Sequence, residues 1–209
     1  MKNSTRYHII ELLRLISDSV LPIIFWISII FGFDTPCIAI LTILCAVIHE
    51  LGHCGAIAFF GVSFALRGHS SGFRIKLSKG RSEMSTVLTL LAGPFINIIL
   101  FLLTLLFGNI MDGYIRNFGY ISLATGVSNL LPLEGYDGYG ALTEIFMIKE
   151  RYDLIKQLES LSFIFSVSLT FLSLYLIDRY SEGYWIFGLF FIMTLSKIYY
   201  FGKYDIFGE

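Results

Sequence analysis

Two histidines and a glutamate stand close together in an apolar stretch of the chain. His49 and His53 are four residues apart, and Glu50 directly follows the first histidine, in the order His-Glu-Leu-Gly-His. Side chains four residues apart project from one face of a helix, so the two imidazoles can converge on one point. Imidazole nitrogens bind zinc at about 2.0–2.1 Å, and a carboxylate beside them can activate a metal-bound water. The spacing therefore predicts a zinc site with His49 and His53 as ligands and Glu50 as the base.

The surroundings of these residues strengthen the prediction of a metal. Residues 36–60 are almost wholly apolar apart from this one turn. An ionisable side chain at bilayer depth costs about 2.5–3.5 kcal/mol even on the more lenient insertion scale. Three such side chains in one turn need a compensating partner, and a divalent cation is the obvious one. The alternative is a polar cluster that is satisfied between helices without a metal.

A third ligand is expected from the segment 129–140, which reads Asn-Leu-Leu-Pro-Leu-Glu-Gly-Tyr-Asp-Gly-Tyr-Gly. Its proline and glycines predict a bent or unwound stretch, which must be buried in protein or line water. Asp137 is an acid without a basic neighbour in the sequence. Because zinc enzymes commonly use three protein ligands, Asp137 is the candidate for the third position, with Glu134 a weaker one. The alternative for Asp137 is a surface loop carboxylate.

A further polar residue, Asn97, lies in another apolar stretch, within the sequence Ala-Gly-Pro-Phe-Ile-Asn. The glycine and proline at 93 and 94 predict a break or kink of the helix. The buried amide of Asn97 requires a hydrogen-bond partner. An ordinary kink with an interhelical asparagine contact would also account for this motif.

The composition indicates a membrane protein. The chain has 209 residues, of which 56 % are hydrophobic and 15 % charged, and its mean hydropathy is +0.74. A soluble domain usually has about 25 % charged residues. The net charge of −1 gives no sign of nucleic-acid binding. The three cysteines predict no disulfide framework, and Cys54, next to His53, points to another helix face and is not expected as a ligand.

The elements that must position these residues are predicted as an all-α, polytopic membrane protein in a single domain, 1–209. About six transmembrane helices surround a three-helix core at 36–146. The predicted spans are 15–33, 36–61, 84–107, 118–146, 158–177 and 184–201, and an amphipathic helix at 5–18 precedes the first. The polar segment 62–83 alternates apolar and basic residues from 73 to 77, which predicts a short β-hairpin with its turn at 68–72.

The distribution of basic residues predicts the orientation in the membrane. Only Arg116 and Arg179 fall in the loops assigned to the outer side. The others fall at the termini and in the alternate loops: Lys2, Arg6, Arg14, Arg67, Arg74, Lys76, Lys79, Arg81, Lys149, Arg151, Lys156, Lys197 and Lys203. The positive-inside rule therefore puts both termini and the hairpin in the cytoplasm.

This orientation brings the polar residues to one depth. At 1.5 Å per residue, His53 lies about 12 Å and Asp137 about 13 Å from the cytoplasmic end of its span. The segment 93–97 lies about 14–20 Å deep by the same measure. Nothing in the histidine motif requires this coincidence, so it favours one shared site for His49, His53 and Asp137.

Taken together, these motifs resemble those of the site-2 protease family of intramembrane zinc metalloproteases. The resemblance rests on residues 49–53, on Gly-Pro-Phe-Ile-Asn at 93–97, and on Asn-Leu-Leu-Pro at 129–132 with Asp137-Gly138. It implies that His49, His53 and Asp137 bind zinc and that Glu50 is the catalytic base. It also implies that Asn97 orients the substrate or its oxyanion.

The resemblance further implies a place and a substrate for the protein. It suggests a multi-pass protein of the bacterial plasma membrane that cuts a membrane-protein substrate, such as an anti-sigma factor, a sporulation sigma precursor or a peptide precursor. The chain departs from the family in having Leu-Glu-Gly-Tyr at 133–136, where proline is frequent, and in having no room for a PDZ or CBS domain. In outline it resembles the sporulation-type branch. Two alternatives are a catalytically silent relative that acts as a membrane scaffold and a metal transporter.

Overall fold

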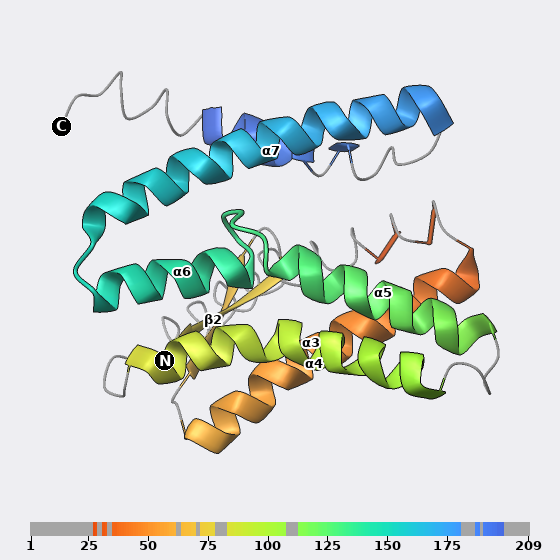
Figure 1. The fold of residues 1–209 in the computed structure, drawn as a ribbon, viewed down its shortest axis with the longest axis horizontal. Helices are drawn as coiled ribbons and strands as arrows, with labels where there is room; N and C mark the ends of the chain where they lie inside the picture. The colour runs from red at the N-terminus through yellow and green to blue at the C-terminus, as the bar shows by residue number, and fades with distance from the viewer. Residues whose placement is uncertain are drawn as a thin grey trace, which may run out of the picture. The chain divides into compact units, whose positions relative to one another are not determined.

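The fold is seen in a computed structural model of the chain (Figure 1). The residues that the structure describes are 27–28, 31–32, 35–61, 64–69, 72–77, 83–107, 113–180, 187–188 and 190–198. They divide into two compact units, Met1–Asn129 and Leu130–Glu209. The predicted amphipathic helix at 5–18, most of the predicted span at 15–33 and part of the predicted span at 184–201 lie outside the described residues.

Helix α3, Pro36–Phe60, carries both histidines and the glutamate. It begins where the sequence predicts, because Pro36 occupies the first turn, where a missing N–H costs nothing. It ends at Gly61, whose φ of 57° is left-handed and whose backbone N–H donates to the Ile57 carbonyl oxygen. A glycine adopts this conformation without the strain that a side chain would bring.

Helices α4, Glu83–Phe107, and α5, Gly113–Asn129, pack with α3 in the first unit (Figure 1). The Ser122 hydroxyl of α5 donates to the Asn97 carbonyl oxygen of α4 at 3.1 Å. The sequence predicts a break or kink of the helix near Gly93, and the break is not seen, because α4 continues through Pro94. Proline removes only one hydrogen bond of the ladder, and α5 covers this stretch closely: a Cβ on Gly126 would lie 2.9 Å from the Pro94 carbonyl oxygen.

A two-stranded antiparallel hairpin follows α3. Strand β1, Phe64–His69, pairs with β2, Gly72–Leu77, in a register that sets Phe64 opposite Leu77 and His69 opposite Gly72. The expected turn at 68–72 is therefore shorter, since Gly68 and His69 belong to β1. The cytoplasmic location of this hairpin stays a prediction.

The second unit contains helices α6, Asp137–Ile148, and α7, Tyr152–Tyr180, which pack against each other. Residues 190–198 are helical as well. The predicted span at 118–146 consists of two helices, α5 and α6, separated by a turn at 130–136, within the segment that the sequence predicts to be bent or unwound. Gly135 in this turn has a φ of +96°, a conformation that glycine adopts without strain.

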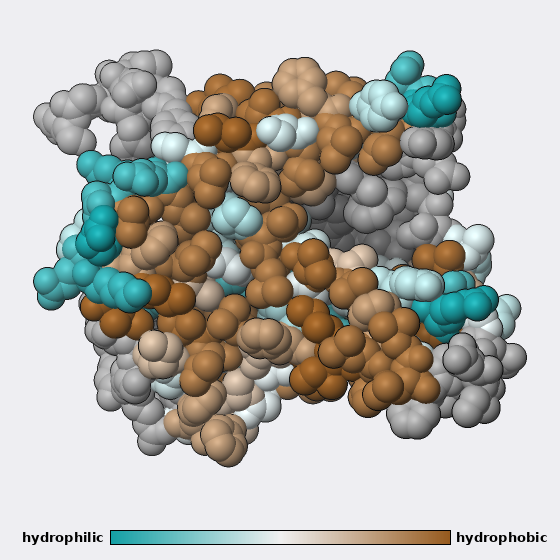
Figure 2. All heavy atoms as spheres, viewed as in Figure 1, coloured by the Kyte–Doolittle hydropathy of each residue, from teal (hydrophilic) through white to brown (hydrophobic). Residues whose placement is uncertain are grey.

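The exposed surface is apolar to an extent that suits lipid. Three helical segments among the described residues are long and apolar enough to cross a membrane: Pro36–Phe60, Met84–Leu106 and Tyr152–Arg179. Large apolar side chains lie exposed along them, and brown, hydrophobic residues dominate the face in Figure 2. The total of six spans is not confirmed.

Candidate metal centre

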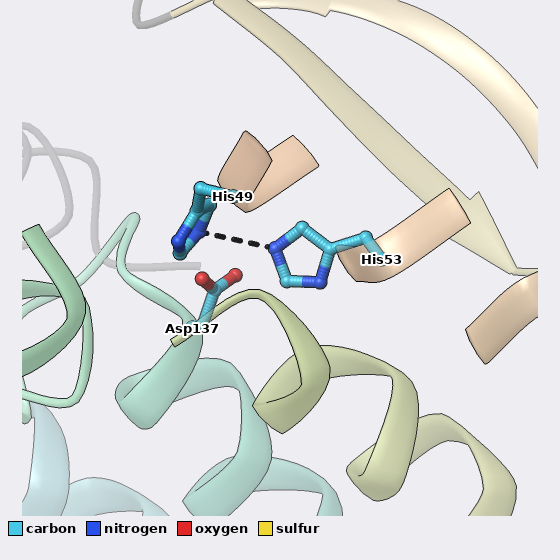
Figure 3. Close-up of side chains that lie close together, drawn as sticks. All are labelled: His49, His53 and Asp137. Atoms are coloured by element: carbon cyan, nitrogen blue, oxygen red, sulfur yellow. Dashed lines mark hydrogen bonds between the residues drawn. The ribbon is translucent and has the colours of Figure 1, made fainter. Parts of the chain in front are cut away.

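The imidazoles of His49 and His53 lie against each other inside the first unit (Figure 3). They stand on successive turns of α3, and both residues are buried, with exposed fractions of 5 % and 6 %. Their Nε2 atoms are 3.2 Å apart, the contact drawn as a dashed line. The ring planes meet at 85°, an edge-to-face arrangement.

The separation of the two Nε2 atoms suits a shared cation. Two nitrogens at about 2.0–2.1 Å from a tetrahedral zinc ion are about 3.3–3.4 Å apart. The 3.2 Å between His49 and His53 is close to that edge length. The donor set of two neutral imidazoles therefore fits zinc, provided that each ring carries its proton on Nδ1 and turns an Nε2 lone pair toward the ion.

A backbone group sets the tautomer of His53. Its Nδ1 lies 2.8 Å from the carbonyl oxygen of Thr89 in α4. A carbonyl oxygen only accepts, so Nδ1 must carry the hydrogen and donate it. The Nε2 of His53 is thereby left with its lone pair, which is the arrangement that a metal-binding histidine requires. Nothing in the sequence pattern pointed to Thr89, because the contact uses its main chain.

Asn97 of α4 stands beside the other ring. Its side chain is fully buried, and its Nδ2 lies 3.4 Å from Nδ1 of His49. Within the described part of the chain, the Asn97 Oδ1 has no hydrogen-bond partner although it is buried. Such an unpartnered buried oxygen is uncommon and costs free energy. The Asn97 amide therefore lies next to His49, and its direct contact with the histidine pair is through the His49 ring.

Gly93 of α4 lies directly against the rings of His49 and His53. A Cβ at this position of α4 would lie 2.8 Å from Nε2 of His49 and 2.6 Å from Cε1 of His53. It would also meet Nε2 of His53. Glycine inside a helix costs about 1 kcal/mol relative to alanine, which signals a packing reason. The sequence pattern predicts a break or kink at Gly93 and does not reveal that a side chain here would overlap the histidine rings.

Glu50 and Cys54 also lie on α3. The side chain of Glu50 is exposed, whereas that of His49 is buried. Cys54 is exposed as well.

Asp137 is the first residue of α6, in the second unit. It is half-buried, and it is the acidic residue of the first helical turn, where a negative charge interacts favourably with the helix dipole. The next residue, Gly138, packs on the backbone of Leu130, which a Cβ would overlap. The turn that ends at Tyr136 is closed by its N–H, which donates to the Leu133 carbonyl oxygen at 3.0 Å.

His49, His53 and Asp137 each offer a ligand atom of a kind that binds metal ions (Figure 3). Figure 3 draws the two histidines from α3 and the aspartate from the start of α6. Two imidazoles and one carboxylate are a donor set typical of catalytic zinc sites, which keep a further position for water. Glu134, the weaker candidate, is not in this group and instead lies near Lys197.

These features define a class: a helical chain with apolar segments of transmembrane length and a buried histidine pair suited to zinc. The site-2 protease from Methanocaldococcus jannaschii is a solved structure with a similar fold, with a TM-score of 0.59 over 85 % of this chain and 85 % of that chain. The two sequences are 20 % identical, so the likeness shows a shared fold. No protein-family model matches the chain, and no curated protein matches it.

Proposed function

We propose that this protein is an intramembrane zinc metalloprotease of the site-2 protease family. In this proposal His49, His53 and Asp137 hold the zinc ion, and Glu50 is the general base. The protein cleaves a peptide bond in or near a transmembrane segment of a substrate protein. The shared fold supports the proposal, and so do the motifs at 49–53, 93–97 and 129–138.

The observation that carries this proposal is the arrangement of the histidine pair. The Nε2 atoms are 3.2 Å apart, and the Nδ1 of His53 donates to a main-chain carbonyl. A Cβ at Gly93 would overlap both histidine rings, so glycine lets α4 approach them closely. A polar cluster without a metal would not need two Nε2 atoms this close together.

The proposed chemistry is hydrolysis by an activated water. Zinc, when bound, supplies a Lewis acid that lowers the pKa of water toward about 7 and polarises the scissile carbonyl. The Glu50 carboxylate accepts the proton of the attacking water and returns it to the leaving amine. Its exposed position on α3 leaves it accessible to water, while the rings of His49 and His53 stay buried.

The proposed setting is the bacterial plasma membrane, with both termini in the cytoplasm and six spans. The three long apolar helices support a membrane location. The orientation rests on the basic residues at the termini and in alternate loops. The substrate we propose is another membrane protein, of the kind represented by anti-sigma factors, sigma precursors or peptide precursors.

The proposal is tested by the metal content of purified protein. We expect about one zinc per chain, because two imidazoles and a carboxylate complete the common catalytic donor set. His53→Ala and Asp137→Ala should each lose the zinc measured by mass spectrometry of the metal. Asp153→Asn is the control, since Asp153 is an exposed acid at the start of α7 that pairs with Arg151.

Two results would contradict this. Zinc retained at wild-type affinity in Asp137→Ala would remove that residue from the ligand set. Wild-type protein that takes up no zinc, and cleaves no membrane-embedded substrate, would remove the assignment as a protease.

For Asn97 we propose a positioning role on His49. A His49 ring that binds zinc through Nε2 carries its proton on Nδ1, which then needs an acceptor. A half-turn of the Asn97 amide exchanges Nδ2 and Oδ1. It brings the oxygen to Nδ1 of His49 and gives the unpartnered Oδ1 a donor. The complete burial of the side chain favours this role over the substrate contact that the family resemblance implies.

Replacement of Asn97 separates these two roles. We expect Asn97→Ala to weaken zinc binding about 10–100-fold, the usual effect of removing a partner of a metal-binding histidine. Asn97→Asp should keep zinc affinity, because a carboxylate also accepts from Nδ1 of His49. Titration with zinc and a competing chelator measures both. If Asn97→Ala bound zinc normally but cleaved no substrate, the role would be substrate contact instead.

A further inference from the structure

A buried lysine in the second unit makes a polar cluster. The charge pattern places Lys197 among the cytoplasmic charges, but its exposed fraction is only 8 %. Its Nζ donates to the Ser162 hydroxyl of α7 at 2.6 Å and lies 3.6 Å from Oε2 of Glu134. Lysine is rarely buried unless it is paired, so this position needs a reason.

The same hydroxyl also binds the turn before α6. The backbone N–H of Glu134 donates to Oγ of Ser162 at 2.8 Å. Ser162 is fully buried, and its oxygen has two lone pairs, which the Lys197 ammonium and the Glu134 amide both use. The hydroxyl oxygen thus joins three separate segments: α7, the helix at 190–198 and the turn at 130–136.

The turn is held at a second point by packing. Leu133 has an exposed fraction of 0 %, and its carbonyl oxygen accepts the N–H of Tyr136. Glu134 lies three residues before Asp137, and Tyr136 is the N-cap residue of α6. Fixing the main chain at Glu134 therefore fixes the start of α6 and the origin of the Asp137 side chain.

The helix that carries Lys197 is itself aligned with α7 by a hydrogen bond between hydroxyls. The Oγ1 atoms of Thr170 and Thr194 are 3.2 Å apart, and both residues are buried. Thr194 lies three residues before Lys197, on the same side of a helix. The lysine is thus directed at Ser162 by its own helix and is not a flexible surface chain.

We infer that Ser162 and Lys197 anchor the turn at 130–136 and are positioning residues for the metal ligand Asp137. The inference rests on the proposed function for the part that concerns the metal. The Lys197 ammonium donates to the Ser162 hydroxyl, which also accepts the main-chain N–H of Glu134 in the turn. The carboxylate of Glu134 balances the charge of the lysine. Neither residue touches the proposed zinc ion.

Two measurements on full-length protein test this inference. The first is the zinc dissociation constant of Lys197→Met and of Ser162→Ala, which should each rise about 10–100-fold, as for other residues that orient a ligand. The second is hydrogen exchange of the amides at 133–137, which should become at least about tenfold faster. The matched controls are Lys156→Met and Ser160→Ala, since both residues are exposed on α7, and they should behave as wild type. If Lys197→Met does not fold, Ser162→Ala, which adds no volume, decides alone.

The outcomes separate this inference from the proposed function. Unchanged exchange at 133–137 in both variants would overturn the anchoring. Faster exchange with wild-type zinc affinity would overturn the positioning role and leave only a structural one. Wild-type protein without zinc would refute the metal site while the exchange data still decide the anchoring.

Discussion

Glu50→Gln is expected to abolish cleavage while the protein keeps its zinc. Glutamine has the shape of glutamate but cannot accept the proton of the attacking water, and a positioned general base contributes about 10²–10⁴-fold in rate. His49 and His53 remain unchanged, so the metal content should stay at the wild-type value. The measurement compares the new protein termini found within membrane spans in cells that express wild type or Glu50→Gln. The uncut protein that accumulates would identify the substrate.

The control for this experiment is Glu159→Gln, because Glu159 is an exposed glutamate on α7 outside the site. It should cleave as wild type does. An equal rate of cleavage by Glu50→Gln, measured on the same substrate in detergent, would show that Glu50 is not the base. Loss of zinc together with activity would instead mean that Glu50 is required for the metal site itself.

Gly93→Ala is expected to weaken zinc binding about 100-fold, the upper end of the range for residues that orient metal ligands. The added methyl group would lie 2.8 Å from Nε2 of His49 and would also meet the His53 ring. Real contacts of a Cβ are longer, so at least one ring must move away from the ion. The stability of helix α4 should not fall, because alanine is favoured over glycine in a helix by about 1 kcal/mol.

The opposite effects of Gly93→Ala on the metal and on the helix make this prediction specific. Zinc affinity should fall while the thermal unfolding of the metal-free protein changes little. Gly55→Ala is the matched control on α3, since a Cβ there meets nothing within 4 Å. Wild-type zinc affinity in Gly93→Ala would show that the space beside the two rings is not where the ion binds.

Much of the local structure is readable from neighbouring residues. Pro36 and Gly61 mark the ends of α3, and apolar composition predicts its length. The spacing of His49 and His53 puts both on one helix face, as the structure has it. These features depend on the 3.6-residue period and on turn chemistry, which act over a few residues and need no knowledge of the rest of the chain.

The break or kink predicted near Pro94 shows the limit of such local rules, because α4 does not break there. The local rule states what proline removes from a helix, namely one N–H donor. It does not say what surrounds the helix there. Close packing of α5, through Gly126 and the hydrogen bond from Ser122, lets α4 continue through the proline.

The sequence by itself predicted the residues to which the proposed chemistry is assigned: the histidine pair, Glu50, and Asp137 as the third ligand. Only the tertiary structure decided what surrounds them. The Thr89 carbonyl at His53, the close approach of Gly93 to the histidine rings and the burial of Lys197 against Ser162 join residues 35–44 positions apart. Such contacts arise from the packing of separate helices, whose register no local periodicity encodes, and so the partners that orient a site appear only when the chain is folded.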